Sequence, residues 1–314
     1  MEGKMKILGI SAGTKNGGND GMCREALMAA KEAGAEVEFI NLFDLDLRHC
    51  TGCTACVQSI FTGKGNPCVL KDDFNWLLDK IYDADGILFC VPIFEKGAAG
   101  IFHTIMDRFG PRMDRVHSII SMKMAEEGQG KGVDPRYLQD KVVSYIAVGG
   151  SDWSTRVQCD FLNQALTPMW KVIDNEVFSW SLGILADDEK VARAHEIGKN
   201  LAEAAADIEH AEYKGDPGMC PHCHCRNFHI GQDNVVTCTA CGIRGKLVID
   251  GEGYKFEFPE EQLEHAHDTI PGKFIHADDI NRNNQRAMGL KMSDKYKERN
   301  QMYKDFIKGS KPEK

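Results

Sequence analysis

Two groups of cysteines are the residues in this chain whose types and spacing most clearly indicate chemistry. Nine of the twelve cysteines in the 314 residues belong to them. The first group is Cys50, Cys53, Cys56 and Cys68, and the second is Cys220, Cys223, Cys225, Cys238 and Cys241. A gap of two residues lets one short turn aim two thiolates at a single ion, so both groups indicate metal sites. A disulfide framework is the alternative, and the N-terminus, which does not read as a secretory signal, disfavours it.

The second group contains two Cys-x-x-Cys knuckles separated by fourteen residues. Four thiolates close a tetrahedral structural site, and the format resembles a zinc ribbon, so we expect Zn²⁺ on Cys220, Cys223, Cys238 and Cys241. A rubredoxin-like iron site is the alternative, which the short spacing disfavours. The other residues that offer a fourth ligand are Cys225, His222, His224 and His229. A unit this small needs a metal to fold.

The first group has three closely spaced thiols and one remote thiol, which eleven residues separate from Cys56. This pattern suits a [4Fe–4S] cluster, which takes four cysteine sulfurs, here Cys50, Cys53, Cys56 and Cys68. Gly52 eases a tight wrap around such a cluster. A zinc site and reduced structural thiols are the alternatives.

A glycine-rich loop from Ser11 to Asp20 joins an apolar run to a helical pattern. Free backbone amides and the positive end of the helix dipole would favour an anion there. Gly13 and Gly18 allow close approach of the backbone, and the side chains that can contact a phosphate are Ser11, Thr14, Lys15 and Asn19. The loop matches neither G-x-G-x-x-G nor G-x-x-x-x-G-K-[ST], which favours a mononucleotide phosphate over a dinucleotide or a triphosphate. A plain Gly/Asn-rich turn is the alternative.

Alternating apolar runs and amphipathic stretches must position these residues. We expect strands at 6–11, 37–42, 86–91, 141–148 and 177–182, and helices at 20–33, 72–82, 100–109, 155–170 and 187–210. Strands that are apolar throughout, each followed by a helix, predict a parallel sheet covered on both faces. The predicted fold class is therefore α/β, a doubly wound five-stranded sheet in the order 2-1-3-4-5.

In that order, two further loops open beside the glycine-rich loop, at the carboxyl ends of neighbouring strands. They contain Pro92, Ile93, Phe94, Glu95, Lys96 and Gly97, and Gly149, Gly150 and Ser151. Their amides can face a flat ring on which Phe94 or Trp153 can stack. Flavin mononucleotide (FMN) has both a phosphate and such a ring. Glu95, Lys96 and Asp152 are the candidates for proton transfer, and the flavin itself would carry the chemistry.

The chain divides by composition into three parts. Residues 1–212 form the α/β domain, with an insertion at about 111–140, residues 213–258 form the zinc-ribbon-like module, and residues 259–314 form a polar tail that we expect to be helical over 286–307. The net charge of −9 makes a nucleic-acid partner unexpected. The apolar runs are too short to cross a membrane.

Residues 1 to about 210 resemble the flavodoxin-like NAD(P)H-dependent FMN reductases and, more narrowly, the iron–sulfur flavoproteins. The residues that carry the resemblance are Ile7-Leu8-Gly9-Ile10-Ser11, Gly17-Gly18-Asn19, the first cysteine series with Gly52, Asp72-Asp73 after Cys68, Pro92-Ile93-Phe94, Asp107-Arg108 and Gly149-Gly150. The chain departs from the family pattern at Gly13-Thr14-Lys15, where Ser-Pro-Arg is frequent, and at Asp20, where Thr or Ser is frequent.

The resemblance implies a fold, a cofactor and a reaction. It implies that Ser11, Gly13, Lys15, Asn19 and Asp20 hold the FMN phosphate, and that 92–97 and 149–151 hold the ring. Because a carboxylate beside a phosphate is unfavourable, Asp20 has a helix cap as its alternative role.

The expected function is that of a cytoplasmic FMN-dependent oxidoreductase, a homodimer or homotetramer. It would pass electrons from NAD(P)H, directly or through the [4Fe–4S] cluster, to an unidentified small-molecule acceptor. The alternative is an iron–sulfur flavoprotein carrier that is reduced by ferredoxin and has no organic substrate of its own.

Overall fold

A parallel β-sheet organises the N-terminal two thirds of the chain in the computed structural model, which describes residues 4–312. Five parallel strands stand in the order β2-β1-β3-β5-β6, and a short β4 pairs antiparallel with the end of β3. Their bounds are β1 (Lys6–Ser11), β2 (Glu36–Asn41), β3 (Gly86–Phe94), β4 (Gly97–Ala98), β5 (Val142–Val148) and β6 (Lys171–Phe178). With β4 set aside this is the predicted order, and the doubly wound fold is confirmed.

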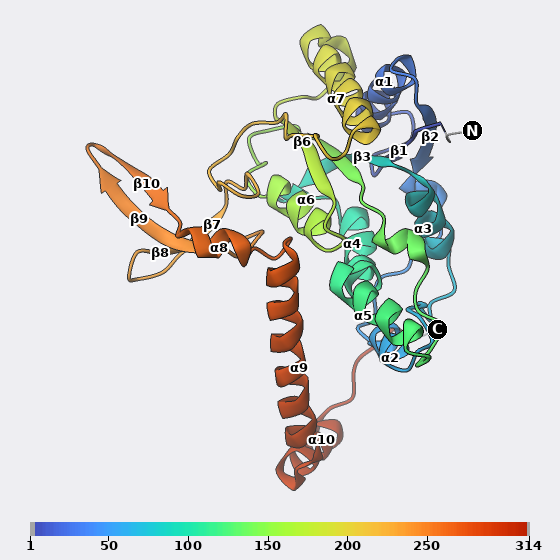
Figure 1. Cartoon of the computed structure of the whole chain (residues 1–314), viewed down its shortest axis with the longest axis vertical. Helices are drawn as coiled ribbons and strands as arrows, with labels where there is room; N and C mark the ends of the chain where they lie inside the picture. The colour runs from blue at the N-terminus through green and yellow to red at the C-terminus, as the bar shows by residue number, and fades with distance from the viewer. Residues whose placement is uncertain (1–3, 313–314) are drawn as a thin grey trace.

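Helices cover both faces of the sheet, which is why its strands are apolar throughout (Figure 1). One face carries α1 (Gly18–Glu32) and α7 (Asp188–Ala206), and the other carries α3 (Phe74–Asp83), α4 (Gly100–Met113) and α6 (Val157–Leu166). In β1, Ile7 packs toward α1 and α7, whereas Leu8 and Ile10 pack toward the opposite helices.

The fifth parallel strand lies earlier in the chain than predicted. The expected range 177–182 is wrong, because β6 begins at Lys171 and ends at Phe178. The run Asp174-Asn175-Glu176 hides the strand, since Asp, Asn and Glu are uncommon in β-strands. Asp174 is fully buried and accepts a hydrogen bond of 2.5 Å from Arg193 of α7, which compensates its charge. Trp180 and Leu182 consequently lie in the loop beyond the strand.

The insertion at about 111–140 folds onto the segment of the first cysteine group. It contains α5 (Arg115–Glu126) and a 3₁₀ turn at Pro135–Leu138. The amide of Lys131 donates to the carbonyl oxygen of Gly63, just after α2 (Ala55–Phe61), at 3.0 Å. A Cβ on Gly63 would clash with the carbonyl oxygen of Gln129, so only glycine permits this contact.

The C-terminal third contains a four-stranded antiparallel sheet and three helices. The strands are β7 (Phe228–Ile230), β8 (Val235–Cys238), β9 (Arg244–Asp250) and β10 (Gly253–Glu257), and the helices are α8 (Glu260–Glu264), α9 (Ile270–Met292) and α10 (Asp294–Phe306). The predicted single tail helix over 286–307 is wrong in its start and its continuity. Thr269 caps α9, and Ser293 Oγ accepts from the amide of Tyr296 to start α10. None of the helices in residues 4–312 is long and apolar enough to cross a membrane.

Candidate functional site

The loop between β1 and α1 offers an anion site made of backbone amides. Gly17 stands at the N-cap of α1 without a side-chain cap, so the amides of the first turn have no capping side-chain acceptor. Asn19 Oδ1 is buried without a hydrogen-bond partner among the described residues, so this acceptor suits a hydroxyl or amide donor of a ligand, while the free backbone amides suit the phosphate. A Cβ on Gly13 would lie 2.6 Å from Cβ of Asn19, so the backbone approaches closely there. The residues present therefore fit the phosphate of FMN.

Asp20 and Asn41 hold this loop in shape. Asp20 is 1% exposed, and its carboxylate accepts hydrogen bonds from the amide of Asn16 at 2.7 Å and from Asn41 Nδ2 at 2.8 Å. Asn41 Nδ2 also donates to the carbonyl oxygen of Gly13 at 3.0 Å. Asp20 thus fixes the conformation of the loop through these hydrogen bonds. Sequence reasoning missed Asn41, whose only signal is its place at the end of β2, beside the end of β1.

The remaining predicted residues of this loop lie at its surface or at its strand end. Ser11 is fully buried, and its Oγ accepts from the amide of Gly13 at 3.2 Å. Thr14 is exposed, and its carbonyl oxygen accepts from the amide of Gly17. Lys15 is half exposed and forms an ion pair with Asp44, which follows β2. The ammonium group of Lys15 therefore lies beside the loop, paired with a carboxylate.

The second predicted loop is a β-hairpin from β3 to β4. Glu95 and Lys96 form its two-residue turn with φ of +48° and +69°, which is the backbone of a type I′ turn. A Cβ on Gly97 would lie 2.6 Å from Asp160 Oδ2 and closer still to Arg156, so a larger residue there would displace these two side chains. Asp160, which the sequence analysis missed, accepts from the amide of Ala98 at 2.8 Å and fixes the hairpin to α6.

The third predicted loop meets the hairpin at the carboxyl edge of the sheet. The amide of Gly149 donates to the carbonyl oxygen of Phe178, and the amide of Ser181 donates to that of Gly149. A Cβ on Gly149 would lie 3.0 Å from Ile93, and one on Gly150 would lie 3.3 Å from Leu182. The segments after β3, β5 and β6 are therefore in contact, beside the loop after β1.

Large apolar side chains stand exposed on these segments. We call Phe94, Trp153, Trp180 and Leu182 the rim; their exposed fractions are 63%, 56%, 69% and 87%. Lys96 Nζ lies 5.3 Å from the centre of the Trp153 ring, a cation–π contact. Glu95 and Asp152 are exposed beside them. The rim offers aromatic faces and both signs of charge, which suits a flat conjugated ligand with a polar edge.

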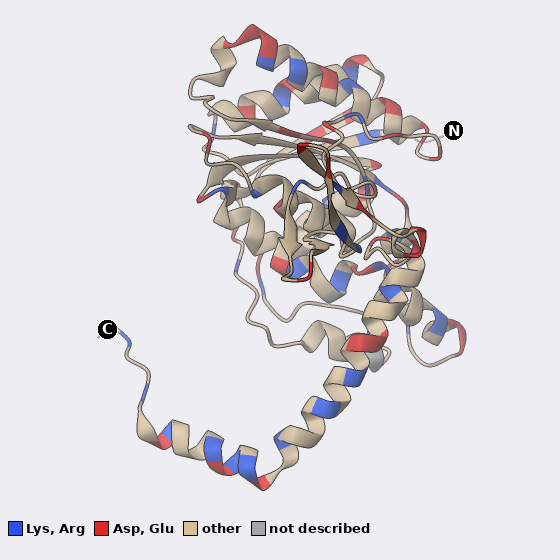
Figure 2. Cartoon of the chain, turned by 90° about the vertical axis from the view of Figure 1, so that its left-hand side faces the viewer, with Lys and Arg blue, Asp and Glu red and all other residues tan. Residues whose placement is uncertain are grey.

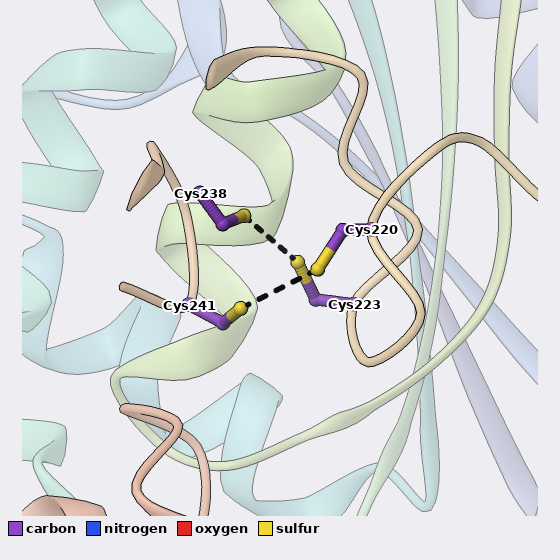
Figure 3. A group of neighbouring side chains, drawn as sticks. All are labelled: Cys220, Cys223, Cys238 and Cys241. Carbon is purple, nitrogen blue, oxygen red and sulfur yellow. Dashed lines mark hydrogen bonds between the residues drawn. The ribbon is translucent and has the colours of Figure 1, made fainter. Parts of the chain in front are cut away.

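The second cysteine group forms a closed four-thiol site. The sulfurs of Cys220, Cys223, Cys238 and Cys241 lie within 4.8 Å of one another, and all four residues are buried (Figure 3). Sγ of Cys220 lies 3.6 Å from that of Cys241, and Sγ of Cys223 lies 3.6 Å from that of Cys238. Four sulfurs at about 2.3 Å from one tetrahedral ion would stand about 3.8 Å apart, so the set fits a single metal ion.

Three of the alternative ligands, His222, His224 and Cys225, have other partners or lie outside the four-sulfur set. His222 Nε2 lies 2.5 Å from Asp268 Oδ1, and this carboxylate raises the pKa of His222. His224 stacks on Tyr213 with ring centroids 4.0 Å apart. Cys225 is buried but lies beside Thr239 and outside the four-sulfur set. The predicted ligands are thus the four that the fold brings together.

The comparison with protein families decides the assignment of the α/β domain. Residues 5–183 match the model of the NADPH-dependent FMN reductase family. The chain belongs to this family. The four-cysteine module and the two long C-terminal helices lie outside the matched range.

Individual proteins extend the comparison to nearly the whole chain. The solved structure of a flavone reductase is 58% identical, covers 98% of this chain and 100% of its own, and superposes with a TM-score of 0.89. Flavone synthase cfoJ of Aspergillus candidus is 28% identical over 267 residues, which are 80% of each chain. An iron–sulfur flavoprotein of Archaeoglobus fulgidus is 27% identical over 208 residues, 64% of this chain and 92% of that protein.

The first cysteine group is open, in contrast with the second. Cys50 and Cys53 are exposed, Cys56 and Cys68 are half-buried, and within residues 4–312 the compact single-ion set is the C-terminal one. Hydrogen bonds from Ala55 and Thr51 lower the pKa of the Cys53 thiol, whereas burial raises the pKa of Cys56. These thiols do not stand at the spacing of ligands to one ion.

Two buried arginines face this open group. Arg108 Nη2 donates to Cys68 Sγ at 3.3 Å, and the same guanidinium pairs with Asp72. The charge of Arg112 acts on the Cys56 thiol. An iron–sulfur cluster with four thiolates is anionic, and hydrogen bonds to its sulfurs tune its potential, so the donor chemistry fits such a cluster.

Proposed function

We propose that this protein is an FMN-dependent reductase that uses NAD(P)H to reduce the carbon–carbon double bond of a flavone-class substrate. The observation that carries the proposal is the 58% identity to a flavone reductase over 98% of the chain. At this identity and coverage the similarity spans the α/β domain, the cysteine module and the C-terminal helices together. The similarity to a flavone synthase concerns the same ring system.

The overall reaction balances as a two-electron reduction. NAD(P)H gives up one hydride, the carbon β to the flavone ketone gains it, and a proton from solvent or a side chain reaches the α carbon. The products are NAD(P)⁺ and the saturated ketone. When bound, FMN supplies the hydride chemistry that no side chain can supply. Nicotinamide and flavone would use the same face in turn, which makes the kinetics ping-pong.

The chain's own residues bind, orient and polarise. Gly13, Asn19 and the first turn of α1 would hold the FMN phosphate, with Lys15 beside the loop. The hairpin 92–97 and the loop 149–151 would contact the isoalloxazine ring of FMN. Phe94 and Trp153 would stack on the flat substrate, and Lys96, held over the Trp153 ring, would place its ammonium at the ketone oxygen, where negative charge develops.

The metals are part of the same proposal. Zn²⁺ on Cys220, Cys223, Cys238 and Cys241 would be structural, because the four buried thiolates leave no open position. A [4Fe–4S] cluster on Cys50, Cys53, Cys56 and Cys68 is supported by the iron–sulfur flavoproteins among the relatives and by Arg108 on Cys68. All twelve cysteines are free, which suits a reducing, cytoplasmic location.

Anaerobic single-turnover kinetics test this function. Protein reconstituted with FMN should bleach rapidly with NADH or NADPH, and flavone added to the bleached protein should restore the flavin spectrum and yield the saturated ketone. Trp153→Leu should raise the KM for flavone at least tenfold while bleaching by NAD(P)H changes less than threefold. Bleaching only by reduced ferredoxin would establish the carrier alternative instead, and reoxidation by quinones but not by flavone would refute the substrate class.

A further inference from the structure

The two C-terminal helices form an arm that stands off the rest of the molecule. We call α9 and α10 the arm (Figures 1 and 2). At its base Lys273 is buried and donates to Asp114 Oδ2 at 2.7 Å, which fixes α9 to the start of α5. Beyond this base both views show α9 leaving the body, and α10 follows it at an angle. Ser293 separates the two helices. With 23 residues α9 extends about 35 Å, so the far half of the arm has no intramolecular cover.

This uncovered half carries an apolar surface. Met292 is 74% exposed, Tyr296 45%, Tyr303 58% and Phe306 82%. Tyr296 and Tyr303 are two turns apart on α10, so they share one face. A groove of about 430 Å³ at the elbow is lined by Leu290, Tyr296 and Tyr303, among others. Clustered aromatic and methionine side chains that a single chain leaves in water mark a protein contact surface.

Charge identifies what the arm can bind. Residues 270–306, which span the arm, contain eight Lys and Arg against five Asp and Glu, whereas residues 1–269 have a net charge of −14. The surface of this same protein is therefore electrostatically complementary to its own arm. The rim adds the matching apolar area. The acidic side chains Glu95 and Asp152 and the basic side chain Lys96 flank it, so the charge complementarity belongs to the body as a whole and the rim supplies the apolar contact.

We propose that the arm of one copy of this chain clasps the rim of a second copy, and that the exchange is reciprocal. A chain cannot cover its own rim in this way, because α9 is one continuous helix that leads away from the sheet (Figures 1 and 2). A twofold dimer buries both arms and both rims at once. Tyr303 and Phe306 of the partner's arm would then cover the flavin and substrate site. The dimer itself does not rest on the flavone chemistry proposed above.

Sedimentation velocity of the full-length chain, with FMN bound, tests the exchange with a matched pair of variants. Tyr303→Glu puts one negative charge on the apolar face of α10, and Gln301→Glu puts the same charge on an exposed polar position of the same helix. We expect a dimer in the wild type, a rise of at least thirtyfold in its Kd for Tyr303→Glu, and less than threefold for Gln301→Glu. A wild type that stays monomeric at about 50 µM, or a Tyr303→Glu dimer of unchanged Kd, overturns the proposal.

Amide hydrogen exchange locates the clasped surface independently of turnover. Peptides covering 150–154 and 180–185 should exchange at least tenfold faster in Tyr303→Glu than in Gln301→Glu, at equal FMN occupancy. Unchanged protection of these peptides in a dissociated variant overturns the assignment of the rim. A dimer with protected rim peptides that does not reduce flavone refutes the proposed function and leaves the arm exchange standing, so the two failures are distinguishable.

Discussion

The two cysteine groups begin from the same Cys-x-x-Cys spacing and reach different structures. Cys220, Cys223, Cys238 and Cys241 converge within 4.8 Å and are buried. Cys50 and Cys53 are exposed on a segment without regular structure before α2. The difference lies in what surrounds the spacing. The second group stands on turns clamped by antiparallel strands, with the amide of Cys238 donating to the carbonyl of Ile243. The spacing of the cysteines predicts a set of metal ligands. The surrounding strands and turns determine whether the thiols are already close together in the fold.

The loss of one ligand from the C-terminal four-thiol site should have the largest effect, and it tests whether this site is the preformed one. Cys238→Ser should remove the ion and unfold residues 213–258, because metal binding stabilises such a module by on the order of 10 kcal/mol. Elemental analysis should show about one zinc per wild-type chain and none in the variant. Cys225→Ser, a buried cysteine outside the set, is the control and should retain zinc. Zinc retained by Cys238→Ser would contradict the ligand assignment.

The next effect concerns the open group. Protein purified without oxygen should contain about four irons per chain, and Cys53→Ser should lose most of them, because a cubane cluster needs four thiolates. Zinc and FMN should stay unchanged, since Cys53 is exposed and does not belong to the C-terminal four-thiol set. If the wild type contains no iron and two zinc ions per chain, the first cysteine group binds zinc and the iron–sulfur cluster is refuted.

A buried ion pair between Arg108 and Asp72 lies beside the first cysteine group. Arg108 and Asp72 are 1% and 0% exposed in their side chains, so Arg108→Met would leave a buried carboxylate without its partner. We expect a loss of about 3 kcal/mol in the free energy of unfolding, measured with urea. Arg136→Met is the control, since its ion pairs with Asp79 and Asp83 are partly exposed, and it should cost at most about 1 kcal/mol. Equal losses would mean that burial does not distinguish the two arginines.

The sequence predicted those parts of the molecule that local patterns determine. Apolar runs gave the sheet order, and the knuckles gave the four-thiol site, because each is encoded within a few residues. It placed the fifth strand too late in the chain because the charge of Asp174 is compensated by Arg193, which lies nineteen residues away on another element. For the same reason it missed Asn41 and Asp160, whose partners belong to other loops.

The tail shows the same limit at a larger scale. Its helical character was predictable from composition, but the break at Ser293 depends on one side chain that accepts from the amide of Tyr296. What covers the exposed face of α10 is not a local property at all. Apolar residues on one face of a helix indicate that another surface must cover that face. Only the arrangement of the whole chain shows that the α/β domain of the same chain does not cover it.

The smallest predicted effect compares one glycine from each cysteine group. Gly52 and Gly242 both have positive φ, +65° and +78°. A Cβ on Gly52 would meet nothing within 4 Å, whereas one on Gly242 would lie 2.9 Å from the ring of His267. Gly52→Ala should therefore cost only the backbone strain, about 1 kcal/mol, and Gly242→Ala should cost that strain and a displaced imidazole.

Hydrogen exchange of the two segments measures this pair, because each substitution acts on local opening. Residues 50–56 should change little in Gly52→Ala, since an open segment can shift its backbone to relieve the strain. Residues 238–245 should lose protection in Gly242→Ala, since the turn is fixed between a buried thiol pair and a packed ring. If the two variants lose equal protection, the first segment is as rigid as the second, and the contrast between an open and a preformed cysteine group fails.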